Sequence, residues 1–274
     1  MSFVSVDYER EAFVFRLPDG LPVYTHYSFL FTALFITAPL WFQGRLSSVV
    51  IALALAAVLF ASILAHELGH VVTARAQQAR AKSIEIGLFG GLANLEWDFH
   101  RGIAMRPVAL AGPVINLGLA GAFFALYWLA ASYGAAEATQ NVTPFEAPAI
   151  LSRTLLLASI LNLGLGLLNL LPAFPLDGGT IAQDLLGGRL GHRRATLIVG
   201  VCGFALTCVG AVVGLAMLLA GTPVFAPLSF RQNWHAIVES WRGGPQQPSK
   251  TAPFAKPSKV VTFRPRSRNP EEKP

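Results

Sequence analysis

The chain has 274 residues, of which 53% are hydrophobic and 13% are charged. Soluble domains average about 25% charged residues, so about half of the expected charge is missing. This composition excludes intrinsic disorder over most of the chain and argues against an ordinary soluble enzyme.

Long stretches without Asp, Glu, Lys or Arg predict helices that cross a lipid bilayer. A crossing needs roughly 20 apolar residues, and the first of these stretches is short for that length. The last has 36 residues interrupted by glycines and prolines, so it predicts one helix and a broken second pass. We therefore expect an all-α membrane protein with five or six transmembrane helices, drawn from Tyr27–Gln43, Leu46–His66, Pro107–Ala136, Thr154–Leu176 and Ala195–Phe230.

The net charge of +6 belongs to the C-terminal tail. Residues 242–274 hold eight Lys or Arg and two Glu, whereas residues 1–241 hold 13 basic and 13 acidic residues. We interpret 1–241 as one membrane-embedded domain and 242–274 as a basic disordered tail, either solvated or in contact with anionic lipid headgroups. Aromatic and basic residues do not alternate as they do in nucleic-acid-binding segments, so no nucleic acid partner is expected.

The basic residues of the loops predict the orientation in the membrane. The loop from Arg75 to Arg106 holds five of them and the loop at 180–194 holds three, whereas the loops at 43–46 and 137–153 hold one each. We therefore expect the first two loops and the N-terminus to be cytoplasmic. Five helices would place the tail outside, and six would return it to the cytoplasm.

The second predicted helix contains the motif His66-Glu67-Leu68-Gly69-His70. Residues four apart lie on the same face of a helix, so both imidazoles can bind one zinc ion. Glu67 can then reach a zinc-bound water as a general base. Ionisable groups beside a transmembrane stretch are costly and usually functional, so a merely polar helix end is the weaker interpretation.

Two histidines leave a catalytic zinc ion one protein ligand short. The fourth apolar stretch ends in Asn169-Leu170-Leu171-Pro172-Ala173-Phe174-Pro175-Leu176-Asp177-Gly178-Gly179, where the prolines break the helix and the glycines permit a sharp turn. The second and fourth helices run in the same direction, so Asp177 lies at the depth of the two histidines. A plain loop is the alternative, but the His motif favours a metal ligand.

With these motifs the chain resembles the site-2 proteases, which are intramembrane zinc metalloproteases. The resemblance also includes Gly20–Val23 leading to His26, Phe89-Gly90-Gly91 and Ala111–Asn116. It implies zinc bound by His66, His70 and Asp177, with Glu67 as the catalytic residue. It further implies that Asn169 faces the active site and binds substrate or the oxyanion. Without room for PDZ or CBS domains, the chain looks like a minimal bacterial member.

We therefore expect a zinc metalloendopeptidase of the bacterial inner membrane that cuts transmembrane segments of other proteins, with its active site towards the cytoplasm. Segment Ser83–Trp97 predicts a small cytoplasmic β-hairpin, which is either purely structural or an edge that pairs with unwound substrate. Gly112, Pro113 and Asn116 predict close helix packing. One alternative is a binding protein that does not cut its partners, but the intact Glu67 argues against it. The other is a metal transporter. A transporter usually carries polar ligands along a path, whereas the intramembrane charges here are predicted at one depth.

Overall fold

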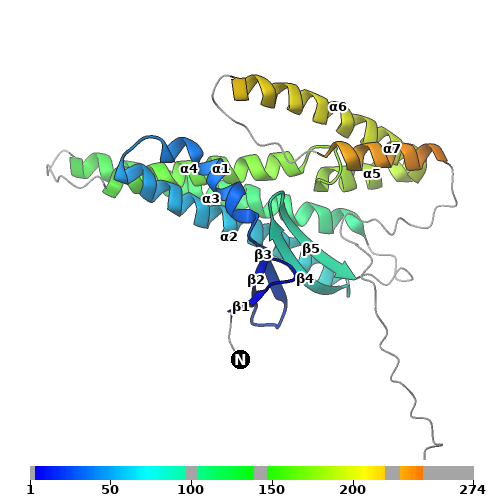
Figure 1. Ribbon diagram of the computed structural model, residues 1–274, viewed down its shortest axis with the longest axis horizontal. Helices are drawn as coiled ribbons and strands as arrows, with labels where there is room; N and C mark the ends of the chain where they lie inside the picture. The colour runs from blue at the N-terminus through cyan, green and yellow to red at the C-terminus, as the bar shows by residue number, and fades with distance from the viewer. Residues whose placement is uncertain (1–3, 97–103, 139–146, 220–228, 243–274) are drawn as a thin grey trace, which may run out of the picture.

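The computed structural model describes residues 4–96, 104–138, 147–219 and 229–242. Long helices form a bundle, and a small β-sheet packs against one side of it (Figure 1). The helices are α1 (Phe29–Trp41), α2 (Leu46–Ala76), α3 (Met105–Ala138), α4 (Ala147–Asn169), α5 (Asp177–Leu190), α6 (His192–Leu219) and α7 (Phe230–Arg242).

Four of the described helices, α2, α3, α4 and α6, are long and apolar enough to cross a bilayer. These four correspond to four of the five predicted stretches. The remaining stretch forms α1, which is apolar but has only 13 residues. The predicted sixth pass falls largely on residues 220–228, outside the described part of the chain, and the chain after it forms the amphipathic helix α7. The predicted tail also lies outside it, apart from Arg242, the last residue of α7.

The predicted hairpin is part of a larger, five-stranded sheet, so the expectation of an all-α protein with one hairpin understated the β structure. The strands lie in chain order β1-β2-β3-β4-β5, and all neighbours are antiparallel except β3 and β4. A parallel pair needs a crossover connection, which α1 and α2 supply here. The strands are β1 (Val4–Asp7), β2 (Ala12–Arg16), β3 (Pro22–His26), β4 (Arg80–Gly87) and β5 (Gly90–Glu96).

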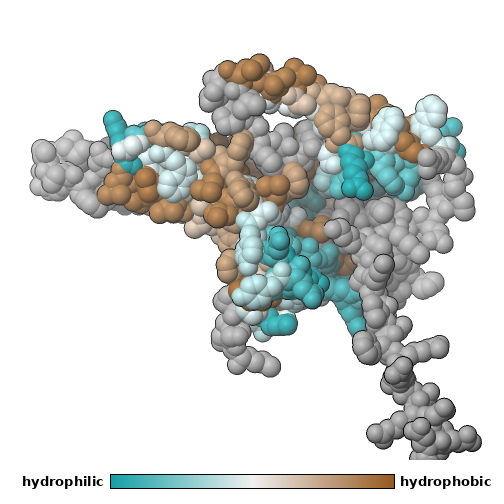
Figure 2. Space-filling view, in the orientation of Figure 1, coloured by the Kyte–Doolittle hydropathy of each residue, from teal (hydrophilic) through white to brown (hydrophobic). Residues whose placement is uncertain are grey.

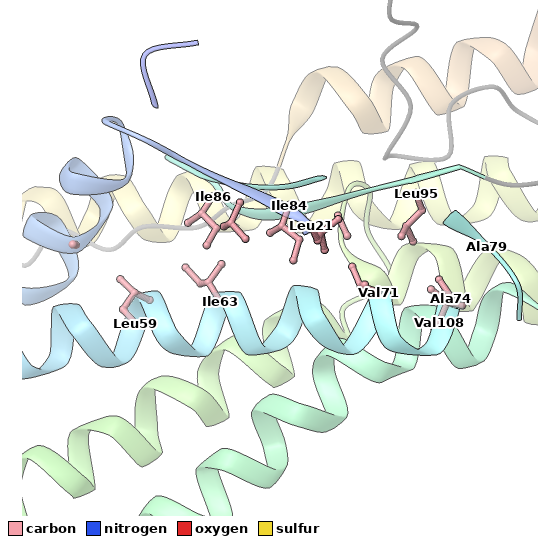
Figure 3. Packing of buried hydrophobic residues seen from close by; sticks show 13 residues of the cluster. Leu21, Leu59, Ile63, Val71, Ala74, Ala79, Ile84, Ile86, Leu95 and Val108 are labelled. Atoms are coloured by element: carbon pink, nitrogen blue, oxygen red, sulfur yellow. The ribbon is translucent and has the colours of Figure 1, made fainter. Parts of the chain in front are cut away.

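The sheet is joined to α2 by a shared hydrophobic core. Ile84 and Ile86 of β4 are fully buried and alternate with more exposed residues, as expected for a strand with one covered face. They point towards Leu59 and Ile63 of α2 (Figure 3). Burial of each such side chain contributes about 1.5–3 kcal/mol, so this core fixes the sheet beside the part of α2 that carries the His motif.

An ion pair holds the β2–β3 turn to the end of α2. Arg75, in the last turn of α2, donates to Asp19. This guanidinium lowers the pKa of the Asp19 carboxyl, and the Leu21 N–H that also donates to it acts in the same direction. Both groups are about 40% exposed, so the contact orients the turn more than it stabilises the fold.

The surface separates into an apolar and a polar part. Hydrophobic residues cover the visible sides of the helices, whereas hydrophilic residues gather over the sheet and near α5 and α7 (Figure 2). Large apolar side chains such as Leu53 on α2 and Val212 on α6 are more than half exposed. Exposed apolar surface of this extent on long helices fits a lipid environment.

Candidate metal centre

The His motif lies on the buried face of α2. His66, Glu67 and His70 are each at most 6% exposed. One ligand atom from each of the three side chains lies within 4.8 Å of the others, close enough to bind a metal ion together. The helical spacing of four residues predicted from the sequence is the cause, because it places the two imidazoles on one face, edge to face, with ring centroids 4.7 Å apart.

Asp177 reaches the same point from another part of the chain. Its Oδ2 lies 3.1 Å from His66 Nε2, and its Oδ1 lies 3.4 Å from His70 Nε2. Asp177 is itself 6% exposed. The structure thus brings Asp177 to the His pair, as the sequence predicts.

The backbone around Asp177 differs from the predicted loop. Asp177 is the first residue of α5, where a carboxylate is favoured by the helix dipole. Gly178 and Gly179 are helical and do not form the sharp turn. Their role is close packing, because a Cβ on Gly178 would overlap the carbonyl of Leu170, and one on Gly179 would lie 2.7 Å from the carbonyl oxygen of Ala173.

Each histidine is oriented through its second ring nitrogen. His70 Nδ1 lies 2.7 Å from the carbonyl oxygen of Val108, which selects the tautomer that leaves Nε2 unprotonated. His66 Nδ1 lies 3.1 Å from the side-chain amide of Asn116, whose own Oδ1 is buried and has no hydrogen-bond partner among the described residues. With the amide turned by 180°, Oδ1 accepts from His66 Nδ1–H, and this tautomer leaves Nε2 of His66 unprotonated.

Strand β5 passes directly beside Glu67. The backbone N–H of Ala93 donates to the Glu67 carboxylate. A Cβ on Gly91 would overlap this carboxylate, so the absence of a side chain there lets the strand approach. Glu67 Oε2 is buried and has no hydrogen-bond partner among the described residues, which leaves one oxygen available to a water or substrate proton.

Gly112 lets α3 approach both imidazoles closely. A Cβ built on Gly112 would lie 2.5 Å from both His66 Nε2 and His70 Nε2, well inside van der Waals contact. A side chain there would therefore displace both rings. The two Nε2 atoms, with the Asp177 carboxylate oxygens 3.1 and 3.4 Å from them, fit a divalent metal ion.

Asn169 is the one predicted site residue that no described interaction joins to this centre. It is the last residue of α4, and its Nδ2 donates to the carbonyl oxygen of Leu165 at 3.0 Å. Three further residues contact the side chains of this centre, namely Asn116, Gly112 and Gly91. The sequence predicted only close packing or a turn for them. No periodicity distinguishes these roles, because they depend on which helix or strand lies opposite.

The other described histidines and the two cysteines do not join this centre. His26 lies near Glu85 on the sheet, and His235 lies near Glu239 on α7. His192 contacts Gln183, and the remaining histidine, His100, lies outside the described residues. Both cysteines are exposed on α6 and form no disulfide.

Curated relatives share part of the chain. "Putative zinc metalloprotease sll0528" of Synechocystis sp. is 36% identical over 150 residues, which are 55% of this chain and 36% of the relative. "Putative zinc metalloprotease Rip3" of Mycobacterium tuberculosis is 35% identical over 167 residues, 61% of this chain and 39% of the relative. "Zinc metalloprotease MJ0392" of Methanocaldococcus jannaschii is 28% identical over 202 residues, which are 72% of this chain and 52% of the relative. The chain thus spans about a third to a half of the length of these relatives.

A solved structure has the same fold. The Site-2 Protease from Methanocaldococcus jannaschii superposes with a TM-score of 0.54, over 88% of this chain and 98% of that chain, at 20% sequence identity. A family model described as Peptidase family M50 matches residues 54–210, more than half of the chain. That segment contains His66, Glu67, His70 and Asp177, and the predicted resemblance is confirmed. The chain belongs to peptidase family M50, the family of the site-2 proteases.

Proposed function

We propose that this protein is a zinc metalloendopeptidase that hydrolyses peptide bonds in or near the transmembrane segments of other proteins. The observation that carries the proposal is the buried group of two imidazoles and one carboxylate beside a glutamate with an unpartnered oxygen. Two nitrogen ligands and one oxygen ligand leave a fourth position open, which is typical of catalytic zinc sites. The zinc metalloproteases among the relatives support the same metal.

Glu67 performs the proton transfers of the hydrolysis. A zinc ion held by His66, His70 and Asp177 supplies a Lewis acid that polarises the scissile carbonyl and makes water a nucleophile near neutral pH. Glu67 accepts a proton from the attacking water as the water oxygen bonds to the carbonyl carbon. It then delivers this proton to the amide nitrogen as the C–N bond breaks. One carboxylic acid and one amine result, and Glu67 returns to its starting state.

Two pairs of neighbouring groups orient the side chains that take part in these steps. The Ala93 N–H and the space at Gly91 hold Glu67 against β5, and the Asn116 amide and the Val108 carbonyl hold the imidazoles. Asn169 is proposed to donate a hydrogen bond to the oxyanion, a contribution typically worth ~3 kcal/mol. Its Nδ2 would exchange its present bond to the Leu165 carbonyl for this one.

Strand β5 is the proposed docking edge for substrate. A helix hides its carbonyl groups in internal hydrogen bonds, so substrate has to become extended, and each unpaired backbone group in lipid costs several kcal/mol. The strand order leaves β1 and β5 as edges, and only β5 contacts Glu67. Since β4 is paired on both sides, the edge of the predicted hairpin that can accept substrate is β5.

The proposed orientation places the active site towards the cytoplasm of a bacterial inner membrane. Arg75 follows His70 after only four intervening residues, a rise of roughly 7 Å along α2. The basic residues near this end of α2 favour the cytoplasmic side. Water would then reach the centre from the inner surface, and cleavage would occur near the cytoplasmic end of the substrate helix.

Metal removal and restoration test the proposal. The protein is reconstituted in vesicles with a single-span peptide, stripped with a chelator and refilled with zinc. We expect cleavage to stop and to return with about one zinc per chain, and Asp177→Ala to lose both. A Cys202→Ala/Cys208→Ala variant serves as the matched control and should keep zinc and activity, because both thiols are exposed on α6 and no described contact joins them to the centre. Near-stoichiometric zinc in Asp177→Ala, or an uncut peptide with zinc-loaded protein, would contradict the proposal.

A further inference from the structure

One side chain of helix α7, that of Asn233, holds the segment of the chain that leads to Asp177. Asn233 is completely buried. Its Oδ1 accepts from the backbone N–H of Phe174 at 3.0 Å, and its Nδ2 donates to the carbonyl oxygen of the same residue at 2.8 Å. The amide of Asn233 thus satisfies both backbone groups of Phe174, as a paired strand would.

The surrounding helices are shaped to admit this amide. Gly203 of α6 faces it, and a Cβ on Gly203 would overlap Asn233 Oδ1. Asn233 Nδ2 also donates to the carbonyl oxygen of Ser229, at 2.8 Å, which fixes the side-chain rotamer. At the other end of α7, Arg193 donates to the carbonyl oxygens of Ser240 and Trp241. Helix α7 is therefore anchored on α6 at both ends, and Asn233 is held rigidly.

Phe174 lies three residues before Asp177, in the connection between α4 and α5. This connection contains Pro172 and Pro175, which have no backbone N–H to donate. Its other described hydrogen bonds are local, such as those from the Ala173 N–H to Leu171 and from the Leu176 N–H to Ala173. The two bonds to Asn233 are the described hydrogen bonds that tie this connection to another helix. Ala173 in the same segment is fully buried and lies close to Gly203.

We propose that Asn233 is a positioning residue for the metal centre: by bridging Phe174 to α7, it fixes Asp177 against His66 and His70. This inference rests on the proposed function for the identity of the metal, and it assigns to α7 a role in the site that it does not touch. Outer partners that orient metal ligands typically change metal affinity 10- to 100-fold when they are removed. An aspartate held only by a loose connection should bind correspondingly weakly.

The test uses the full-length protein in detergent, with Asn233→Ala compared with Ser240→Ala. Ser240 is a matched control because it is buried on the same helix, and its hydroxyl bonds only to the Ile237 carbonyl within α7. Two quantities are measured: zinc affinity by competition with a chelator, and hydrogen exchange of peptides covering residues 170–177. Because the two prolines carry no amide hydrogen, the Phe174 amide is one of six in that segment.

We expect Asn233→Ala to exchange faster at this segment and to bind zinc at least about tenfold more weakly, while Ser240→Ala matches the wild type in both. Gly203→Ala, which displaces the same amide from α6, should reproduce both effects and covers the case in which Asn233→Ala fails to fold. Unchanged exchange or unchanged zinc affinity in folded Asn233→Ala would overturn the inference. Failure of the wild-type protein to bind zinc would instead contradict the proposed function, and the exchange comparison would still decide whether Asn233 fixes the segment.

Discussion

Replacement of Gly112 by alanine tests whether the two imidazoles, in the positions that this glycine permits, bind the metal ion. The added methyl group would lie 2.5 Å from Nε2 of both His66 and His70. Carbon and nitrogen atoms that are not bonded rest about 3.5 Å apart or more, so the rings would have to move. Each ring is held by its Nδ1 contact, to Val108 or to Asn116, and movement would break these contacts.

The expected loss of affinity follows from this geometry. Removal of an outer partner of a metal ligand typically costs 10- to 100-fold in affinity. The added methyl group would displace both imidazole donors themselves, so the loss should exceed 100-fold. A loss of 100-fold corresponds to about 2.8 kcal/mol. Helix α3 itself should not be weakened, because alanine favours a helix by about 1 kcal/mol over glycine.

Zinc affinity is measured by chelator competition on the purified variants, and thermal unfolding of the metal-free proteins is measured alongside. Gly118→Ala is the control: it adds the same methyl group to the same helix, and nothing lies within 4 Å of its Cβ. We expect Gly118→Ala to bind zinc like the wild type. If Gly112→Ala binds zinc with wild-type affinity, the assignment of both Nε2 atoms as metal ligands is wrong.

Three further outcomes follow from the structure and the proposed function. In a cysteine-free background, Ala76→Cys at the exposed end of α2 should react with a soluble maleimide added from the cytoplasmic side. Leu53→Cys, on the lipid-facing surface, should not react. Labelling of Ala76→Cys only from outside would show that the orientation is the reverse of the proposed one. Leu92→Cys on β5 should form a disulfide with a cysteine placed near the cleavage site of the substrate. A cysteine on the opposite edge strand β1 should not. Equal disulfide yields at the two strands would contradict the assignment of β5 as the docking edge. Asn116→Ala should lower zinc affinity about 10- to 100-fold because His66 loses its orienting contact, and unchanged affinity in a zinc titration would show that this contact is dispensable.

The proximity of the proposed metal ligands could be predicted from the sequence because their geometry is mostly local. A spacing of four residues fixes the relative position of His66 and His70 on any helix. Asp177 is not local, but the alternation of crossing directions placed it at the same depth, and its distances to both rings bear out that reasoning. The predicted directions of the helices thus indicated that Asp177 lies near the histidines, which the spacing along the chain could not.

Other features depended on contacts that a single sequence does not encode. Strands β1 to β3 are short, and the pairing of β3 with β4 requires the parallel crossover through two helices. Gly91 and Gly112 look like ordinary turn or packing glycines until Glu67 and the imidazoles are placed opposite them. Asn233 lies in a polar segment that followed a degenerate apolar stretch, and only its burial against Phe174 gives it a role.

Cleavage of a membrane-embedded peptide by Glu67→Gln tests the central claim most directly. The variant removes the proton acceptor and leaves His66, His70 and Asp177 in place. We predict that the purified variant holds about one zinc ion per chain, as the wild type does, and cuts the peptide at least about 100-fold more slowly, because a general base typically contributes 10²- to 10⁴-fold. Cleavage by the zinc-loaded variant at the wild-type rate would contradict the assignment of Glu67 and the mechanism built on it.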